Sequence, residues 1–263
     1  MKELTSLRIG IIGFGNLGSA IAKRLIEVQV PPLQIQAIAR ASNRGAITEL
    51  GVTTVEDGHF APLDILICTT KPGQFEKAWQ SVQSVAEYQP LIISFMAMLS
   101  LARLQEITGS SRIVRAMTTT PCVIGRGIGA WISTAELDAT NRELATTVLE
   151  SLGTHLPTEQ ESEIAIATVL SSINGWIFEL IHALEQGLNF IGAPRKYQEL
   201  IVTVIESAIT YRRSLPKTHL IALADAVTSP GGTTAQLRQV LERAGFNAIL
   251  AEGIKAAHER AKG

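Results

Sequence analysis

Residues Arg8–Gly18, which read Arg-Ile-Gly-Ile-Ile-Gly-Phe-Gly-Asn-Leu-Gly, decide the fold that we expect for the first half of the chain. The stretch over residues 8–13 predicts a short apolar strand. The spacing of Ile21, Leu25 and Ile26 then predicts a helix over residues 17–28. A strand, a Gly-x-Gly-x-x-Gly turn and a helix in this order are typical of the first βα unit of a dinucleotide-binding domain.

Each glycine of this turn has its own expected task. Gly13 makes the turn, Gly15 lets a pyrophosphate approach the backbone, and Gly18 lets the helix pack against the strand. Asn16 and Leu17 open the helix, whose N-terminus favours an anion. We therefore expect all five residues to bind the cofactor.

The end of the second expected strand, residues 35–39, indicates which cofactor binds. Sites for NAD usually carry an acidic residue here, which binds the ribose hydroxyls. This chain has Arg40, Ser42 and Arg44 instead, which suit the 2′-phosphate of NADPH. The alternative is that both arginines are solvated surface charges. We expect NADPH to be preferred over NADH.

Further strands are expected over residues 64–69, 91–95, 112–117, 129–133 and 154–156, with helices over residues 74–85, 101–107 and 138–151. The strand over residues 64–69 runs into Thr70, Lys71 and Pro72. Ligands of doubly wound sheets bind outside the carboxyl ends of the strands, so we expect these three residues to border the cofactor. The alternative for Lys71 is a solvated loop lysine.

The composition excludes several classes of protein. The 263 residues carry a formal net charge of −1, which gives no basic field for nucleic acid and no polybasic patch for a membrane. Cys68 and Cys122 show neither a disulfide framework nor metal-ligand spacing, as is typical of a reducing compartment. Residues 1–8 lack the apolar core of a signal peptide. We expect a cytoplasmic protein without a metal.

The second half of the chain is expected to be helical from Glu161 onward. Its first helix, residues 161–190, is apolar on most of its circumference, yet polar residues within it argue against a membrane span. A small helical domain cannot easily cover such a helix, which favours a homodimer; burial against the first domain alone is the alternative. We expect an α/β protein with a dinucleotide-binding Rossmann domain over residues 1–158 and an all-helical dimerisation domain over residues 159–263.

The loop Thr228–Thr234, which reads Thr-Ser-Pro-Gly-Gly-Thr-Thr, is where we expect the substrate. Gly231 and Gly232 permit unusual backbone angles, and a helix begins directly afterwards. Backbone N–H groups and hydroxyls at a helix N-terminus can seat a carboxylate. The alternative is a tight turn between two helices.

Taken together, the chain resembles the Δ1-pyrroline-5-carboxylate reductase family over essentially its whole length. The matching segments are Gly13–Gly18 with the following Ser-Ala-Ile-Ala, the pair Lys71-Pro72, Met117–Pro121, Val227–Thr234 and Leu241–Phe246. The resemblance implies a Rossmann domain, an interlocking helical dimerisation domain, and NADPH-dependent reduction of a cyclic imine carboxylate to proline.

The resemblance also implies roles for individual residues. Ser229, Gly231, Gly232 and Thr233 would bind the substrate carboxylate, and the catalytic Thr234 would hydrogen-bond near the ring nitrogen. Ser171 matches a serine of the family's substrate site, and Thr119 lies in a loop beside the cofactor. Reduction of an iminium ion needs no strong acid, because the substrate nitrogen arrives protonated and positioning supplies the acceleration.

Three segments depart from the family pattern. The family's asparagine in the Met117–Pro121 loop is Thr119, its Ala-Ala-Gly is Met96-Ala97-Met98, and its Ser-Gly-Ser-Gly-Pro-Ala-Tyr is Ser171–Ile177 with only the first serine kept. These departures motivate two alternatives, a paralogue that reduces a different imine acid and a non-catalytic NADP-binding sensor. A β-hydroxyacid dehydrogenase is disfavoured, because residues 161–190 contain no lysine that could donate a proton.

Overall fold

The computed structural model describes residues 4–56 and 58–262. The chain divides into two compact units: one contains the residues up to Ser171 together with those from His258 onward, and the other is Ser172–Ala257. The strands all belong to the first unit, and the second is helical. The predicted class, an α/β dinucleotide-binding fold followed by a helical half, is confirmed. The boundary between residues 158 and 159 stays a prediction.

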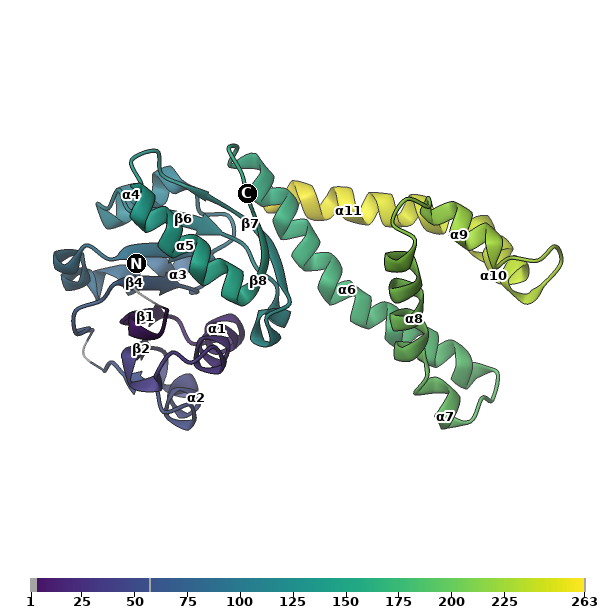
Figure 1. Ribbon diagram of the computed structural model, residues 1–263, viewed down its shortest axis with the longest axis horizontal. Helices are drawn as coiled ribbons and strands as arrows, with labels where there is room; N and C mark the ends of the chain where they lie inside the picture. The colour runs from purple at the N-terminus through teal and green to yellow at the C-terminus, as the bar shows by residue number, and fades with distance from the viewer. Residues whose placement is uncertain (1–3, 57, 263) are drawn as a thin grey trace. The chain divides into compact units, whose positions relative to one another are not determined.

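The first unit is built on one eight-stranded sheet, ordered β3-β2-β1-β4-β5-β6-β7-β8 (Figure 1). Neighbouring strands are parallel except for β6 and β7, which are antiparallel. The strands are β1 (Ile9–Ile12), β2 (Ile35–Ile38), β3 (Thr53–Thr54), β4 (Ile65–Cys68), β5 (Leu91–Ser94), β6 (Ile113–Ala116), β7 (Gly127–Ser133) and β8 (Gly153–Pro157).

The register of the central strands places their carboxyl ends at one level. Ile12, the last residue of β1, pairs with Ile38 of β2 on one side and with Cys68 of β4 on the other. The chain order reverses between β1 and its two neighbours, and such a switch point is where open parallel sheets bind their ligands.

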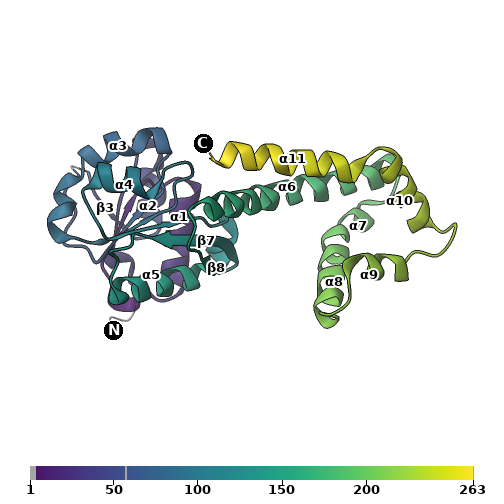
Figure 2. The same cartoon turned by 90° about the horizontal axis from the view of Figure 1, so that it is seen from above.

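Helices cover both faces of the sheet, as its buried, largely apolar central strands require. Leu25 and Leu149 pack into the core on one face, and Phe75 and Leu104 into the core on the other. Figure 2 shows α3 and α4 on one side of the sheet and α5 on the other. The helices of this unit are α1 (Asn16–Glu27), α2 (Arg44–Glu49), α3 (Pro72–Gln80), α4 (Leu101–Thr108) and α5 (Ala139–Leu152).

The predicted elements of this unit are present with small shifts at their ends. The largest difference is the helix expected over residues 74–85, which begins at Pro72 and ends at Gln80. Proline is well suited to the first position of a helix, because its missing N–H would have no partner there. A separate 3-10 helix, Gln83–Tyr88, follows. The short β3 and α2 were not expected from the sequence.

The helical half begins with α6 (Ser162–Phe190), as predicted, and continues with α7 (Arg195–Gln198), α8 (Ile201–Ser214), α9 (Leu220–Ala226), α10 (Thr233–Arg243) and α11 (Phe246–Lys262). No residue of α7 to α10, all of which are described, is buried. Phe178, Val204 and Leu237 expose about 60% or more of their surface. A single copy of this unit therefore leaves large apolar side chains uncovered.

By length and composition α6 could also cross a membrane, and only 22% of its most apolar window is buried. It also carries polar residues, among them Glu179 and His182, in its middle. The exposed apolar surface of α6 is also of the kind that forms an interface between two copies of a chain.

Candidate functional site

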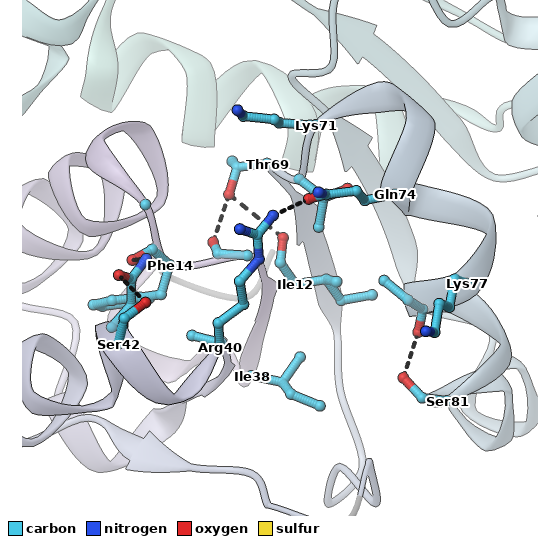
Figure 3. A pocket seen from close by; sticks show the side chains of 16 residues that line it. Ile12, Phe14, Ile38, Arg40, Ser42, Thr69, Lys71, Gln74, Lys77 and Ser81 are labelled. Carbon is cyan, nitrogen blue, oxygen red and sulfur yellow. Dashed lines mark hydrogen bonds between the residues drawn. The ribbon is translucent and has the colours of Figure 1, made fainter.

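A cavity of about 660 Å³ lies at the carboxyl ends of β1, β2 and β4. Its volume is in the usual range for small-molecule sites. Four segments form its walls: the glycine turn, the chain after β2, the residues between β4 and α3, and the face of α3 shown in Figure 3. The lining residues are Ile12, Gly13, Phe14, Gly15, Ile38, Ala39, Arg40, Ser42, Asn43, Thr69, Thr70, Lys71, Gln74, Lys77, Ala78 and Ser81.

The three glycines of the turn have different surroundings. Gly13 has φ +92°, a left-handed value that other residues resist, and its carbonyl accepts a hydrogen bond from the Thr69 hydroxyl at 2.6 Å. A Cβ on Gly18 would lie 2.2 Å from the Gly13 oxygen, so this glycine lets α1 pack against the turn. A Cβ on Gly15 would meet nothing within 4 Å. The open side of Gly15 is the place where a ligand can approach the backbone.

The end of β2 supplies a cation to the cavity. The Arg40 guanidinium reaches across to α3 and donates to the Gln74 side-chain oxygen. Ser42 lies on the same wall, and the neighbouring Asn43 donates its amide to the Phe14 carbonyl at 3.0 Å, which ties this wall to the glycine turn. Arg44 does not line the cavity; its guanidinium lies 3.5 Å from a Glu56 carboxylate oxygen.

The other predicted cofactor residues are placed differently. Thr70 and Lys71 line the cavity, whereas Asn16, Leu17, Gly18 and Pro72 lie in the helix starts beside it. Thr119 is buried, and its hydroxyl accepts a hydrogen bond from the Ile128 N–H at 3.1 Å. The contacts of these residues with a cofactor stay predictions.

Four lining residues on α3 and directly after it were not predicted: Gln74, Lys77, Ala78 and Ser81. They are spaced three and four apart, as expected for one face of a helix. This face carries one lysine, and none of the described residues that line the cavity is acidic. The periodicity was visible in the sequence, but nothing in it said which face of this helix turns toward the glycine turn.

The segment after β5 departs from the expected backbone pattern. Met98 has φ +61°, at the position where the family carries glycine, and its side chain is 43% exposed. A non-glycine residue in this region costs about 1–2 kcal/mol. Met96 is buried, and its sulfur accepts a hydrogen bond from the Thr70 hydroxyl at 3.2 Å, which connects the segment to the cavity wall.

A partly buried ion pair, in which only Arg115 is buried, lies beside the residues that follow this segment. Arg115 of β6 donates to the Glu161 carboxylate at 2.5 Å, and the same carboxylate oxygen accepts from the Leu101 N–H at 2.8 Å. Glu161 thereby joins β6, the start of α4 and the residues just before α6. Removing one partner of such a pair is costly, because the other charge stays buried.

One histidine borders the Met117–Pro121 loop. The His155 Nε2 lies 2.8 Å from the Thr118 hydroxyl oxygen. Burial lowers the pKa of His155, and backbone groups of Gly153 and Leu149 partly offset this effect. The ring is therefore neutral at physiological pH.

The expected substrate loop lies between α9 and α10. Gly231 has φ +69°, and the Gly232 N–H donates to the Ser229 carbonyl at 3.0 Å. No side chain caps the N-terminus of α10, so its first N–H groups are available to an anion. Ser229, Gly231, Thr233 and Thr234 are exposed, and Gly232 is half-buried.

Thr234 also lines a cavity of about 310 Å³ within the second unit. Its other walls come from α9, α10 and the start of α11, including Ile221, Arg238 and Phe246. The remaining predicted substrate residue, Ser171, is half-buried on α6. The structure thus gathers the predicted loop residues at one helix start, and their contacts with a substrate stay predictions.

Two family models match the chain. Residues 161–263 match the family described as pyrroline-5-carboxylate reductase dimerisation, and residues 8–98 match the one described as NADP oxidoreductase, coenzyme F420-dependent. The second match, the glycine turn and the cavity above it together support NADP binding by the first unit.

Named relatives and a solved structure agree with these matches. The pyrroline-5-carboxylate reductases of Aquifex aeolicus and Synechocystis are 29% and 27% identical to this chain, and both alignments cover 98% of each partner. The structure of Plasmodium falciparum pyrroline carboxylate reductase with NADP bound is 22% identical, has a TM-score of 0.89, and matches over 99% of this chain and 98% of that one. The chain is thus similar to pyrroline-5-carboxylate reductases over nearly its whole length.

Proposed function

We propose that this protein uses NADPH to reduce a cyclic imine carboxylate, with Δ1-pyrroline-5-carboxylate as substrate and L-proline as product. The observation that carries the proposal is the similarity to pyrroline-5-carboxylate reductases over nearly the whole chain. Each unit also keeps its own motif: the first has the glycine turn with its cavity, and the second has the Ser-Pro-Gly-Gly-Thr-Thr loop.

The residues of the first unit suit a phosphorylated dinucleotide. The open side of Gly15 admits a pyrophosphate to the start of α1, where the helix dipole favours an anion. Arg40, Lys71 and Lys77 line the cavity, and no acidic residue is among the lining side chains that the structure describes, which supports NADPH over NADH. NADPH supplies the hydride of the reaction.

The residues of the second unit suit the substrate. The free N–H groups at the start of α10 bind the carboxylate, assisted by the Ser229 and Thr233 hydroxyls. Thr234 then hydrogen-bonds near the ring nitrogen and orients it. A substrate that arrives protonated at nitrogen needs no general acid, so these residues act by positioning and charge stabilisation.

The dimerisation family match and the exposed apolar side chains of α6 to α10 support a homodimer or larger homo-oligomer in which α6 is an interface helix. The proposal places this protein in the cytoplasm, with neither a nucleic-acid nor a membrane partner. A β-hydroxyacid dehydrogenase remains disfavoured, because α6 contains no lysine.

A different imine is the second candidate, since Met98 and Thr119 replace residues of the family pattern beside the expected nicotinamide position. The test is to follow NADPH oxidation with Δ1-pyrroline-5-carboxylate and with its six-membered homologue. Turnover with the five-membered ring supports the proposal, and preference for the larger ring supports the second candidate. NADPH binding without turnover on either ring would refute the proposal and leave another imine or a sensor role.

A further inference from the structure

One contact crosses the cofactor cavity. Arg40 starts at the carboxyl end of β2, and its Nη2 donates to the Gln74 Oε1 on α3. Figure 3 shows the Arg40 side chain extended between the two walls, with its guanidinium beside Gln74. Both residues line the cavity, so the contact lies on the surface that a ligand meets.

The partner of Arg40 is an uncharged side-chain amide. By contrast, Arg44 pairs with the Glu56 carboxylate at 3.5 Å, and Arg103 pairs with that of Glu76 at 2.8 Å. A carboxylate partner opposes the charge of the arginine that it holds. Gln74 holds Arg40 with an uncharged amide, which orients the guanidinium and leaves its charge intact.

We infer that Gln74 is a positioning and specificity-determining residue: it holds Arg40 for the 2′-phosphate of NADPH and, being uncharged, keeps that arginine available to the phosphate. This inference rests on the proposed use of NADPH. A guanidinium has five N–H donors, and Gln74 engages one nitrogen, so donors remain for a bidentate contact with phosphate.

The surroundings of the contact support this role. Lys77 follows Gln74 by one turn on the same helix and lines the same cavity. Among the described residues that line the cavity none is acidic, whereas Lys71 and Lys77 are basic, so the charged groups on its walls favour an anion. Gln74 itself is exposed, which makes it replaceable without disturbing the core.

The decisive variant is Gln74→Glu, which keeps the shape and places a carboxylate beside Arg40. We would measure affinities of the full-length protein for NADPH and NADH, and for 2′,5′-ADP and AMP, by calorimetry. We expect at least about tenfold weaker binding of NADPH and 2′,5′-ADP, with NADH and AMP changed by less than about twofold. The loss should shrink as salt is added, because the new repulsion is electrostatic.

Gln80→Glu is the matched control: it makes the same change on the same helix, at an exposed residue that does not line the cavity. Gln74→Leu removes the hydrogen bond without adding charge, and should weaken NADPH by a smaller factor than Gln74→Glu. Equal losses for both cofactors, or no loss with Gln74→Glu, would overturn the inference. If the wild-type protein bound NADH as tightly as NADPH, the proposed cofactor preference would be wrong as well. If the Gln74→Glu variant still preferred NADPH as strongly as the wild type does, only the role of Gln74 would be wrong.

Discussion

Substitution of Gly15 by valine separates cofactor binding from folding. The backbone at Gly15 is extended, with φ −82° and ψ −160°, which valine adopts without strain. A Cβ at this position meets nothing within 4 Å, so the chain itself has room for the side chain. The pyrophosphate of the cofactor is expected to occupy this same open space, against the start of α1.

The size of the effect follows from the contacts that the side chain displaces. A hydrogen bond between a backbone N–H and a phosphate oxygen contributes about 1.5–3 kcal/mol. Losing two of them weakens binding by about 3–6 kcal/mol, which is more than about 100-fold. The free energy of unfolding should change little, because two effects oppose each other. Valine is a poorer N-cap residue than glycine by about 1 kcal/mol, but it also lowers the conformational entropy of the unfolded chain.

The assay is a titration with NADPH together with thermal unfolding. Gly18→Ala is the comparator, since its Cβ would lie 2.2 Å from the Gly13 oxygen and 2.8 Å from the Thr69 hydroxyl. That clash should destabilise the fold by about 1–3 kcal/mol. Unchanged NADPH affinity in Gly15→Val, or an unchanged unfolding temperature in Gly18→Ala, would refute this account of the turn.

Three further predictions concern single side chains. Arg40→Ala should weaken the binding of NADPH by about 10–100-fold and that of NADH much less. The control Arg44→Ala removes an arginine outside the cavity and should weaken the binding of either cofactor less. Equal losses of affinity for the two cofactors in Arg40→Ala would show that Arg40 does not recognise the 2′-phosphate. Thr234→Ala should lower turnover by about three- to tenfold with NADPH affinity intact, against the exposed Thr210→Ala as control, and normal turnover would move the chemistry elsewhere. The folded-state pKa of His155 lies below its ordinary value of 6.5, so the unfolded chain binds this proton more readily, and the associated stability is present above pH 6.5 and lost as the pH falls. His155→Gln should therefore flatten the pH dependence of the unfolding temperature between about pH 5 and about pH 7.5, and an unchanged slope would contradict the assignment.

The sequence was informative where local rules determine the structure. The strand, turn and helix over residues 8–28 could be predicted because apolar periodicity and glycine geometry are local properties. The long helix α6 and the start of α10 after the Gly231-Gly232 pair were predicted for the same reason.

The sequence was less informative where the answer depends on distant neighbours. Arg40 and Arg44 looked equivalent, but only the first lines the cavity, because Glu56 engages the second. Gln74 was missed because its role depends on which face α3 turns toward β2. The left-handed conformation of Met98 had no local signal either, since methionine rarely adopts it.

The last residues of the chain belong to the first unit, not to the helical one that precedes them. Residues from His258 onward are grouped with the sheet-containing unit, and Ala261 is buried. The chain therefore returns to the first unit after the whole of the second one, so the first unit is complete only once residues 258–262 have been synthesised. Removal of these residues would leave the nucleotide-binding unit incomplete even though its sheet is intact.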